Sequence, residues 1–98
     1  MTSEEIIELM DGKFEDEYNK FEHIPAEEKL AENNDICAML FLYNHLKDKK
    51  KFDISPAHDI IYLPGVDDLV ELIEEDVLYL TRCGVHYESD YDCFAINT

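Results

Sequence analysis

The sequence is poor in basic residues, and this scarcity limits the kinds of partner it can have. Eight lysines and arginines face 24 aspartates and glutamates, which gives a formal net charge of −16. Direct nucleic-acid binding is excluded because phosphates would be repelled, and electrostatic binding to an anionic membrane surface is excluded for the same reason. The charge instead favours a basic protein as the partner.

Long apolar runs, glycines and cysteines are also scarce. The longest apolar run, Ile36–Tyr43, has eight residues, whereas a membrane-spanning helix needs about 20. With only three glycines, the chain contains no glycine-rich phosphate loop or nucleophile turn. Three cysteines are an odd number and no signal peptide is recognisable, so we expect reduced thiols and a cytoplasmic location.

The sequence does contain enough apolar material for one folded unit. It has 98 residues, of which 46% are hydrophobic, and this indicates a single acidic globular domain spanning residues 1–98. Residues 1–35 and 67–98 carry net charges of −9 and −8, whereas residues 36–66 carry +1. The fold could therefore bring two acidic segments together.

The first half of the chain shows helical periodicity. Thr2 and Glu5 have the spacing of a capping box, and a long helix with one apolar stripe is expected to follow. The stripe comprises Ile7, Met10, Phe14, Tyr18 and Phe21. Pro25 is expected to open a short second helix. A third helix, capped by Asn34 or Asp35, is apolar on all sides in "ICAMLFLY" and is predicted to be buried, with the lysines that follow suiting the negative end of its dipole.

The second half of the chain predicts strands around one further helix. "DIIYL" (59–63) has the composition of a strand that ends at Pro64–Gly65. Asp67 is expected to cap a helix, unless "EED" at 74–76 begins a helix after a break. The core face of that helix would comprise Leu69, Val70, Leu72, Ile73, Val77 and Leu80. Gly84 should end it, and "VHY" with "YDCFAI" should form a terminal hairpin.

These elements together predict an α+β fold. N-terminal helices are followed by a strand, a helix and a C-terminal hairpin, which form a small, mainly antiparallel sheet.

Two acidic stripes are the strongest functional signal. Side chains three or four positions apart on a helix have Cβ atoms about 5–6 Å apart, so a row of carboxylates can imitate the charges of a nucleic-acid backbone. The first stripe comprises Glu4, Glu8, Asp11, Glu15 and Glu22. The second comprises Asp67, Asp68, Glu71, Glu74 and Glu75, if the helix from Asp67 is continuous. We predict that these acids bind the partner, and the alternative is a solvated face that serves only solubility.

Catalytic and metal sites have weaker support. An incomplete zinc motif comprises Cys83, His86 and Cys93, and a fourth ligand would have to come from Cys37, His45 or His58. A Cys-His-Asp triad is defined by geometry, so the presence of these residue types is weak evidence for catalysis. Asp90–Asp92 lacks the glycine and the ligand series of a calcium loop. We therefore expect no enzymatic activity, no bound metal and no cofactor.

A short segment resembles a known family. "DIIYLP" followed by "DD" is similar to the segment of colicin-type nuclease immunity proteins in which Asp, Leu or Ile, Ile, Tyr, Tyr and Pro precede an acidic turn. Those proteins are small acidic inhibitors of bacterial nucleases. The resemblance covers about ten residues and implies that Asp59 and Tyr62 contact the partner and that the segment is a short helix. Leu63 replaces the family's second tyrosine, and that all-helical family lacks the hairpin predicted at 85–96.

Charge and motifs together predict a non-enzymatic inhibitor. It would occupy the basic nucleic-acid site of a nuclease or DNA-binding protein by mimicking nucleic acid, as small inhibitors from phages and mobile elements do. One alternative is an immunity-like or antitoxin protein that neutralises a toxic nuclease, and another is a structural or adaptor module without mimicry. Either a monomer or a homodimer is compatible with the sequence.

Overall fold

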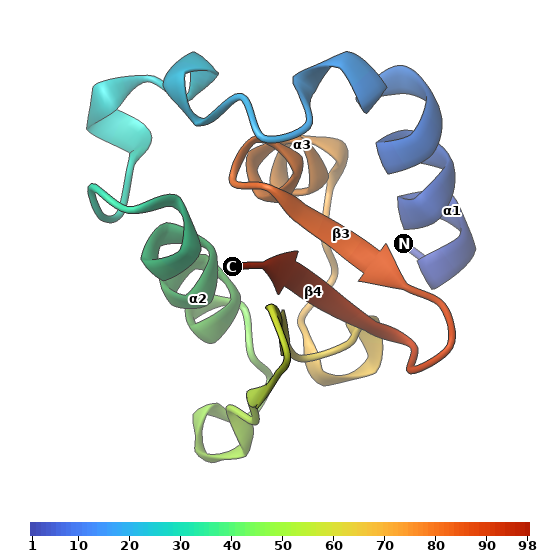
Figure 1. The fold of residues 1–98 in the computed structure, drawn as a ribbon. Coiled ribbons are helices and arrows are strands. Elements are labelled where there is room, and N and C mark those ends of the chain that lie inside the picture. The colour runs from blue at the N-terminus through green and yellow to red at the C-terminus, as the bar shows by residue number, and fades with distance from the viewer.

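A computed structural model describes the whole chain, residues 1–98, as an α+β fold, which confirms the predicted fold class (Figure 1). The three α-helices are α1 (Ser3–Glu8), α2 (Asn34–Asn44) and α3 (Glu74–Arg82). The four strands are β1 (Ser55–Ala57), β2 (Ile60–Tyr62), β3 (Val85–Glu88) and β4 (Cys93–Asn97). Figure 1 shows α1 and α2 at opposite sides of the molecule, with the β3–β4 hairpin between them.

The sheet is antiparallel throughout, with strand order β1-β2-β4-β3. The predicted strand at "DIIYL" is confirmed as β2, and the predicted terminal hairpin is confirmed as β3 and β4. The segment 60–62 is therefore a strand and not the short helix that the immunity-protein resemblance implies. Strand β1 was not predicted, because "SPA" has neither β-branched nor aromatic residues.

The core lies between the sheet and the three helices. Phe94, Ile96 and Val85 contribute fully buried side chains from the hairpin. They belong to the same apolar cluster as Leu80 of α3 and Leu42 of α2. This single cluster holds the α-helical and β-strand parts of the domain together.

The first helix is shorter than the apolar stripe predicts. The Thr2 capping box is confirmed, since the Glu5 N–H donates to the Thr2 hydroxyl and the Thr2 N–H donates to the Glu5 carboxylate. After Glu8, however, residues Leu9–Lys13 form a π-helical turn around Gly12. The wider turn aligns Ile6, Met10 and Phe14 toward the core. Tyr18, which was expected to continue the stripe, is exposed.

Helix α2 is not buried on all sides, so that prediction is wrong. Cys37, Ala38 and Leu42 are buried, whereas the opposite side of the helix is exposed. A domain of this size has one core, and only one face of α2 reaches it. The expected role of the following lysines is confirmed for Lys49, whose Nζ donates to two carbonyls at the end of α2 at 3.1 and 3.3 Å.

No continuous helix runs from Asp67. Residues Val66–Asp68 form a 3₁₀ turn, residues 69–73 are extended, and α3 begins at Glu74, as the alternative starting at "EED" predicts. The extended conformation prevails because the Val70 N–H donates to the His45 carbonyl at 2.7 Å and the Lys47 N–H donates to the Asp68 carbonyl at 3.0 Å. Val70 and Ile73 are consequently exposed and not on a core face.

Helix α3 ends as the sequence predicts. Gly84 follows its last turn with φ +91°, a conformation that favours glycine, and donates its N–H to the Thr81 carbonyl at 3.0 Å. The chain then enters β3 directly.

Candidate partner-binding site

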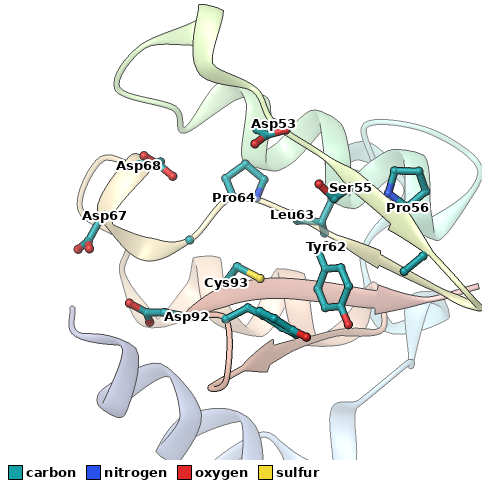
Figure 2. Close-up of a pocket in the computed structure, with 13 residues that line it drawn as sticks. Asp53, Ser55, Pro56, Tyr62, Leu63, Pro64, Asp67, Asp68, Asp92 and Cys93 are labelled. Carbon is teal, nitrogen blue, oxygen red and sulfur yellow. The ribbon is translucent and has the colours of Figure 1, made fainter.

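The largest hollow on the surface is a groove of about 760 Å³ beside strands β1 and β2 (Figure 2). Its lining includes four aspartates and two tyrosines but no lysine, arginine or histidine. These six residues, which we call the aspartate groove, are Asp53, Tyr62, Asp67, Asp68, Tyr91 and Asp92. Figure 2 shows Asp67 and Asp68 toward one end of the groove and Tyr62 toward the other. The groove is therefore both acidic and aromatic.

Main-chain contacts around Gly65 hold two walls of the groove together. The Phe94 N–H donates to the Pro64 carbonyl at 3.2 Å, and the Leu63 N–H donates to the Phe94 carbonyl at 2.8 Å. A Cβ atom at Gly65 would lie 2.3 Å from the carbonyl oxygen of Asp92. Only glycine allows the segment after β2 to pass this close to the β3–β4 turn.

The Tyr87 hydroxyl joins the same two walls. It accepts a hydrogen bond from the Val66 N–H at 3.4 Å and donates one to the Asp92 carboxylate at 2.8 Å. The ring packs edge-on against Phe94, with centroids 4.9 Å apart. Burial, followed by the hydrogen bond to Asp92, raises the pKa of Tyr87, so the hydroxyl keeps its proton and remains a donor. Tyr87 is a positioning residue for Asp92.

Tyr62 and Tyr91 form the aromatic part of the groove. Their ring centroids are 5.1 Å apart at an interplanar angle of 68°, which is an edge-to-face contact. Tyr91 is 67% exposed, whereas Tyr62 is half-buried on β2. Burial, and to a smaller extent the neighbouring Tyr91 and Glu88, raise the pKa of Tyr62. Neutral phenols beside carboxylates suit a lysine or arginine side chain, which binds both aromatic faces and carboxylates.

The groove combines residues that the sequence assigned to two separate hypotheses. Asp67 and Asp68 come from the predicted acidic stripe, and Tyr62 comes from the immunity-protein resemblance. Asp59 does not line the groove. It lies in the β1–β2 turn with φ 59°, and its side chain is 89% exposed.

Three members of the groove were not predicted as binding residues. Asp53 and Tyr91 lie in loops, and Asp92 was considered only as a cation contact. The one signal in the sequence was the exposed "DYD" turn at 90–92, whose proximity to Asp67 depends on the β3–β4 hairpin.

The remaining acids of the second stripe lie elsewhere, so their predicted arrangement on one helical face is wrong. Glu71 pairs with the amino group of Met1, and Glu74 pairs with Lys13 at 3.0 Å. Glu75 is exposed beside a hollow between α2 and α3. Glu71 lies within the extended segment 69–73 and shares a hollow with Asp67, whereas Glu74 and Glu75 follow that segment on α3.

The first stripe is also divided, although all four predicted binding acids, Glu4, Glu8, Asp11 and Glu15, are exposed. Glu8 lines a hollow that it shares with Glu74. Asp11 and Glu15 line another, beside His86. The π-helical turn at Leu9–Lys13 changes the helical period after Glu8. Glu8 therefore faces a different hollow from Asp11 and Glu15. Glu8 belongs to the acidic segment 1–35 and Glu74 to the acidic segment 67–98. Because both line the same hollow, the two acidic segments nevertheless meet there.

Most of the acids have no cationic neighbour. Six of the 24 lie within ion-pair distance of an amino group, guanidinium or histidine, which leaves 18 without one. The shortest pair between side chains joins Glu17 to Arg82 at 2.6 Å, and this contact, followed by the hydrogen bond to His23, lowers the pKa of Glu17. The unpaired acids leave a strongly negative surface.

The structure does not bring together Cys83, His86 and Cys93. No group of three or more histidines, cysteines, aspartates or glutamates is placed to hold a metal ion. Cys83 is fully buried, and burial raises the pKa of its thiol. Burial likewise raises the pKa of Cys93, the one thiol that lines the groove, so this thiol is a poor nucleophile at neutral pH.

The fold and the site define a small acidic α+β domain with an aspartate- and tyrosine-lined groove at one end of its sheet. No protein-family model, curated protein or solved structure matches the chain. None of its helices combines the length and the apolar character needed to cross a bilayer.

Proposed function

We propose that this chain is a non-enzymatic inhibitor that binds the basic nucleic-acid site of a nuclease or DNA-binding protein. The observation that carries the proposal is the aspartate groove, whose lining holds four carboxylates and two tyrosines and no basic side chain, although Lys47 Nζ donates to the Asp67 main-chain carbonyl. Nucleic-acid sites present lysines and arginines, often beside surfaces that accept planar bases. The groove offers the complementary carboxylates and aromatic rings.

Charged groups of both signs continue beyond the groove. Asp67 and Asp92 also line a neighbouring hollow that contains Glu71, Lys47 and the amino group of Met1, which pairs with Glu71. Met1 in turn lines the hollow that contains Glu8 and Glu74. Lys47, the Met1 amino group and Lys13 interrupt the acids between the groove and the junction of α1 and α3, so the proposal rests on the groove itself.

A second candidate is an immunity-like or antitoxin protein that neutralises a toxic nuclease. Tyr62 supports it, because the residue that the resemblance assigns to partner contact lies in the groove and is partly exposed. The two candidates share one surface and differ in the partner. In both, a tyrosine that becomes buried in the contact would contribute strongly to the lifetime of the complex.

The test begins with identifying a partner and continues with competition. The immobilised chain is used to capture proteins from its host at low and high salt, and a captured protein is then purified. We expect nucleic acid to displace the chain from the purified partner, and the chain to block nucleic-acid binding or cleavage by that partner. Binding that nucleic acid does not compete would contradict inhibition by mimicry and favour the adaptor alternative.

Matched charge variants test whether the groove makes the contact. Asp67→Asn with Asp68→Asn removes two charges from the groove, and Asp16→Asn with Glu27→Gln removes two from exposed positions outside it. The groove variant should lower the association rate by roughly tenfold and weaken its salt dependence, because electrostatic steering is lost. Equal effects of the two variants would mean that net charge alone, and not the groove, attracts the partner.

A further inference from the structure

Helix α2 presents an apolar face to solvent on the side away from the core. Ile36, Leu40 and Tyr43 are 44%, 40% and 38% exposed. Their spacing of four and three residues places them in one row along the helix. No charged residue lies between Asp35 and Lys47. Single exposed apolar residues are common on protein surfaces, but a continuous row along a helix is typical of a contact surface.

The charges at the two ends of α2 have opposite sign. Glu32 and Asp35 lie at its N-terminal end. Four of the seven lysines of the chain follow its C-terminal end at positions 47, 49, 50 and 51. Figure 1 shows the turn of residues 49–51 beyond the C-terminal end of α2, at the far end from residues 26–33.

This arrangement is self-complementary. In a two-fold symmetric dimer the same surface of both copies meets in opposite directions, so an antiparallel pair of α2 helices would place each acidic end against a basic end. Leu40 would lie near the symmetry axis, with Ile36 of each copy facing Tyr43 of the other. Two chains of net charge −16 repel each other over most of their surfaces, but the apolar row from Ile36 to Tyr43 contains no acid, and four lysines follow it.

We infer that the exposed face of α2 is the interface of a homodimer in which two α2 helices pack antiparallel. The inference does not depend on the proposed function, because no residue of α2 lines the aspartate groove. The dimer would carry two grooves, one on each copy, with Lys47 of the basic end beside Asp67 of the groove. A bivalent inhibitor of this kind would bind a dimeric or multisite partner more tightly than one copy does.

Sedimentation over a wide concentration range at about 0.15 M salt tests the interface. The unaltered chain should dimerise reversibly, and Leu40→Glu should abolish the dimer because it buries two charges near the axis. Val70→Glu is the matched control, since Val70 is as exposed as Ile36 but lies beside Met1 and Glu71, outside α2. We expect Val70→Glu to dimerise normally. We also expect Leu40→Glu and Val70→Glu to keep the circular dichroism spectrum of the unaltered chain. A chain that is monomeric at every concentration, or a Leu40→Glu dimer of unchanged affinity, would overturn the inference; in the first case the α2 face would be left to a different partner.

A charge exchange tests the antiparallel arrangement independently of the apolar contact. Glu32 and Lys50 are exposed, and neither side chain makes an ion pair within the chain. Glu32→Lys or Lys50→Glu alone should raise the dissociation constant by about tenfold, because each creates repulsion at both symmetry-related ends. Mixing the two variants should restore association, since opposite charges then meet at both ends. Failure of the mixture to associate more tightly than either variant alone would overturn the antiparallel pairing.

Discussion

Replacing Tyr62 with alanine should destabilise the domain and also weaken partner binding. Tyr62 pairs with Ser55 and Ala95 across two strands, and its half-buried ring contacts Tyr91. Removing a fully buried aromatic ring costs about 3–5 kcal/mol, so a half-buried ring should contribute about 2 kcal/mol. For a domain of this length that loss corresponds to a fall of roughly 10 °C in Tm.

A double-mutant cycle separates the ring contact from the burial of Tyr62. Tyr91 is 67% exposed, so Tyr91→Ala should lose little beyond the ring–ring contact. The coupling between Tyr62→Ala and Tyr91→Ala should be about 0.5–1.5 kcal/mol, measured by urea denaturation. Tyr18→Ala is a suitable control, because Tyr18 is 41% exposed and does not line the aspartate groove. Its coupling to Tyr91→Ala should be close to zero.

The result that would refute this reasoning is a Tyr62→Ala protein with unchanged stability. The ring would then not pack against β4 and Tyr91, and Tyr62 would act only as a binding residue, as the immunity-protein resemblance implies. With a purified partner, the present reasoning predicts that Tyr62→Ala both lowers Tm and speeds dissociation, whereas Tyr91→Ala mainly speeds dissociation.

Three further predictions concern the rest of the domain. Raising salt from near zero to about 0.15 M should raise Tm by about 4–8 °C, because screening relieves the repulsion among 18 unpaired acids; a flat response would mean that these acids are locally compensated. Gly65→Ala should cost about 1–3 kcal/mol in urea denaturation, because its Cβ would meet the Asp92 carbonyl at 2.3 Å, and a neutral effect would show that this contact is loose in solution. Arg82 lowers the pKa of Glu17, so the stability that this pair adds is present above the ordinary pKa of 4.5 and is lost as pH falls through the folded-state pKa. Glu17→Gln should therefore reduce the loss of stability seen between pH 5 and 3, measured by urea denaturation at each pH, and an unchanged pH profile would contradict the pairing.

The lining of the aspartate groove was predicted less completely than the fold. Asp67 and Asp68 were proposed as binding residues from charge, and Tyr62 from a local resemblance, but the groove that the three residues share was not predicted. Asp53 and Asp92 are 39 positions apart in the sequence and meet only because β1, β2 and β4 are neighbours in the sheet. The predicted helical face from Asp67 to Glu75 failed because backbone hydrogen bonds to residues 45–47 hold part of that segment extended.

The sequence by itself determined the features that depend on local interactions and on composition. The Thr2 capping box, the strand-forming composition of β2, the end of α3 at Gly84 and the terminal hairpin each depend on residues close together in the chain. The strong negative charge follows from composition alone. Tertiary structure decided the length of the first helix, the exposed face of α2 and the position of every acid relative to the others. The physical reason is that one small core buries only one face of each element, and long-range backbone pairing outweighs the weak helical preference of a segment such as 69–73.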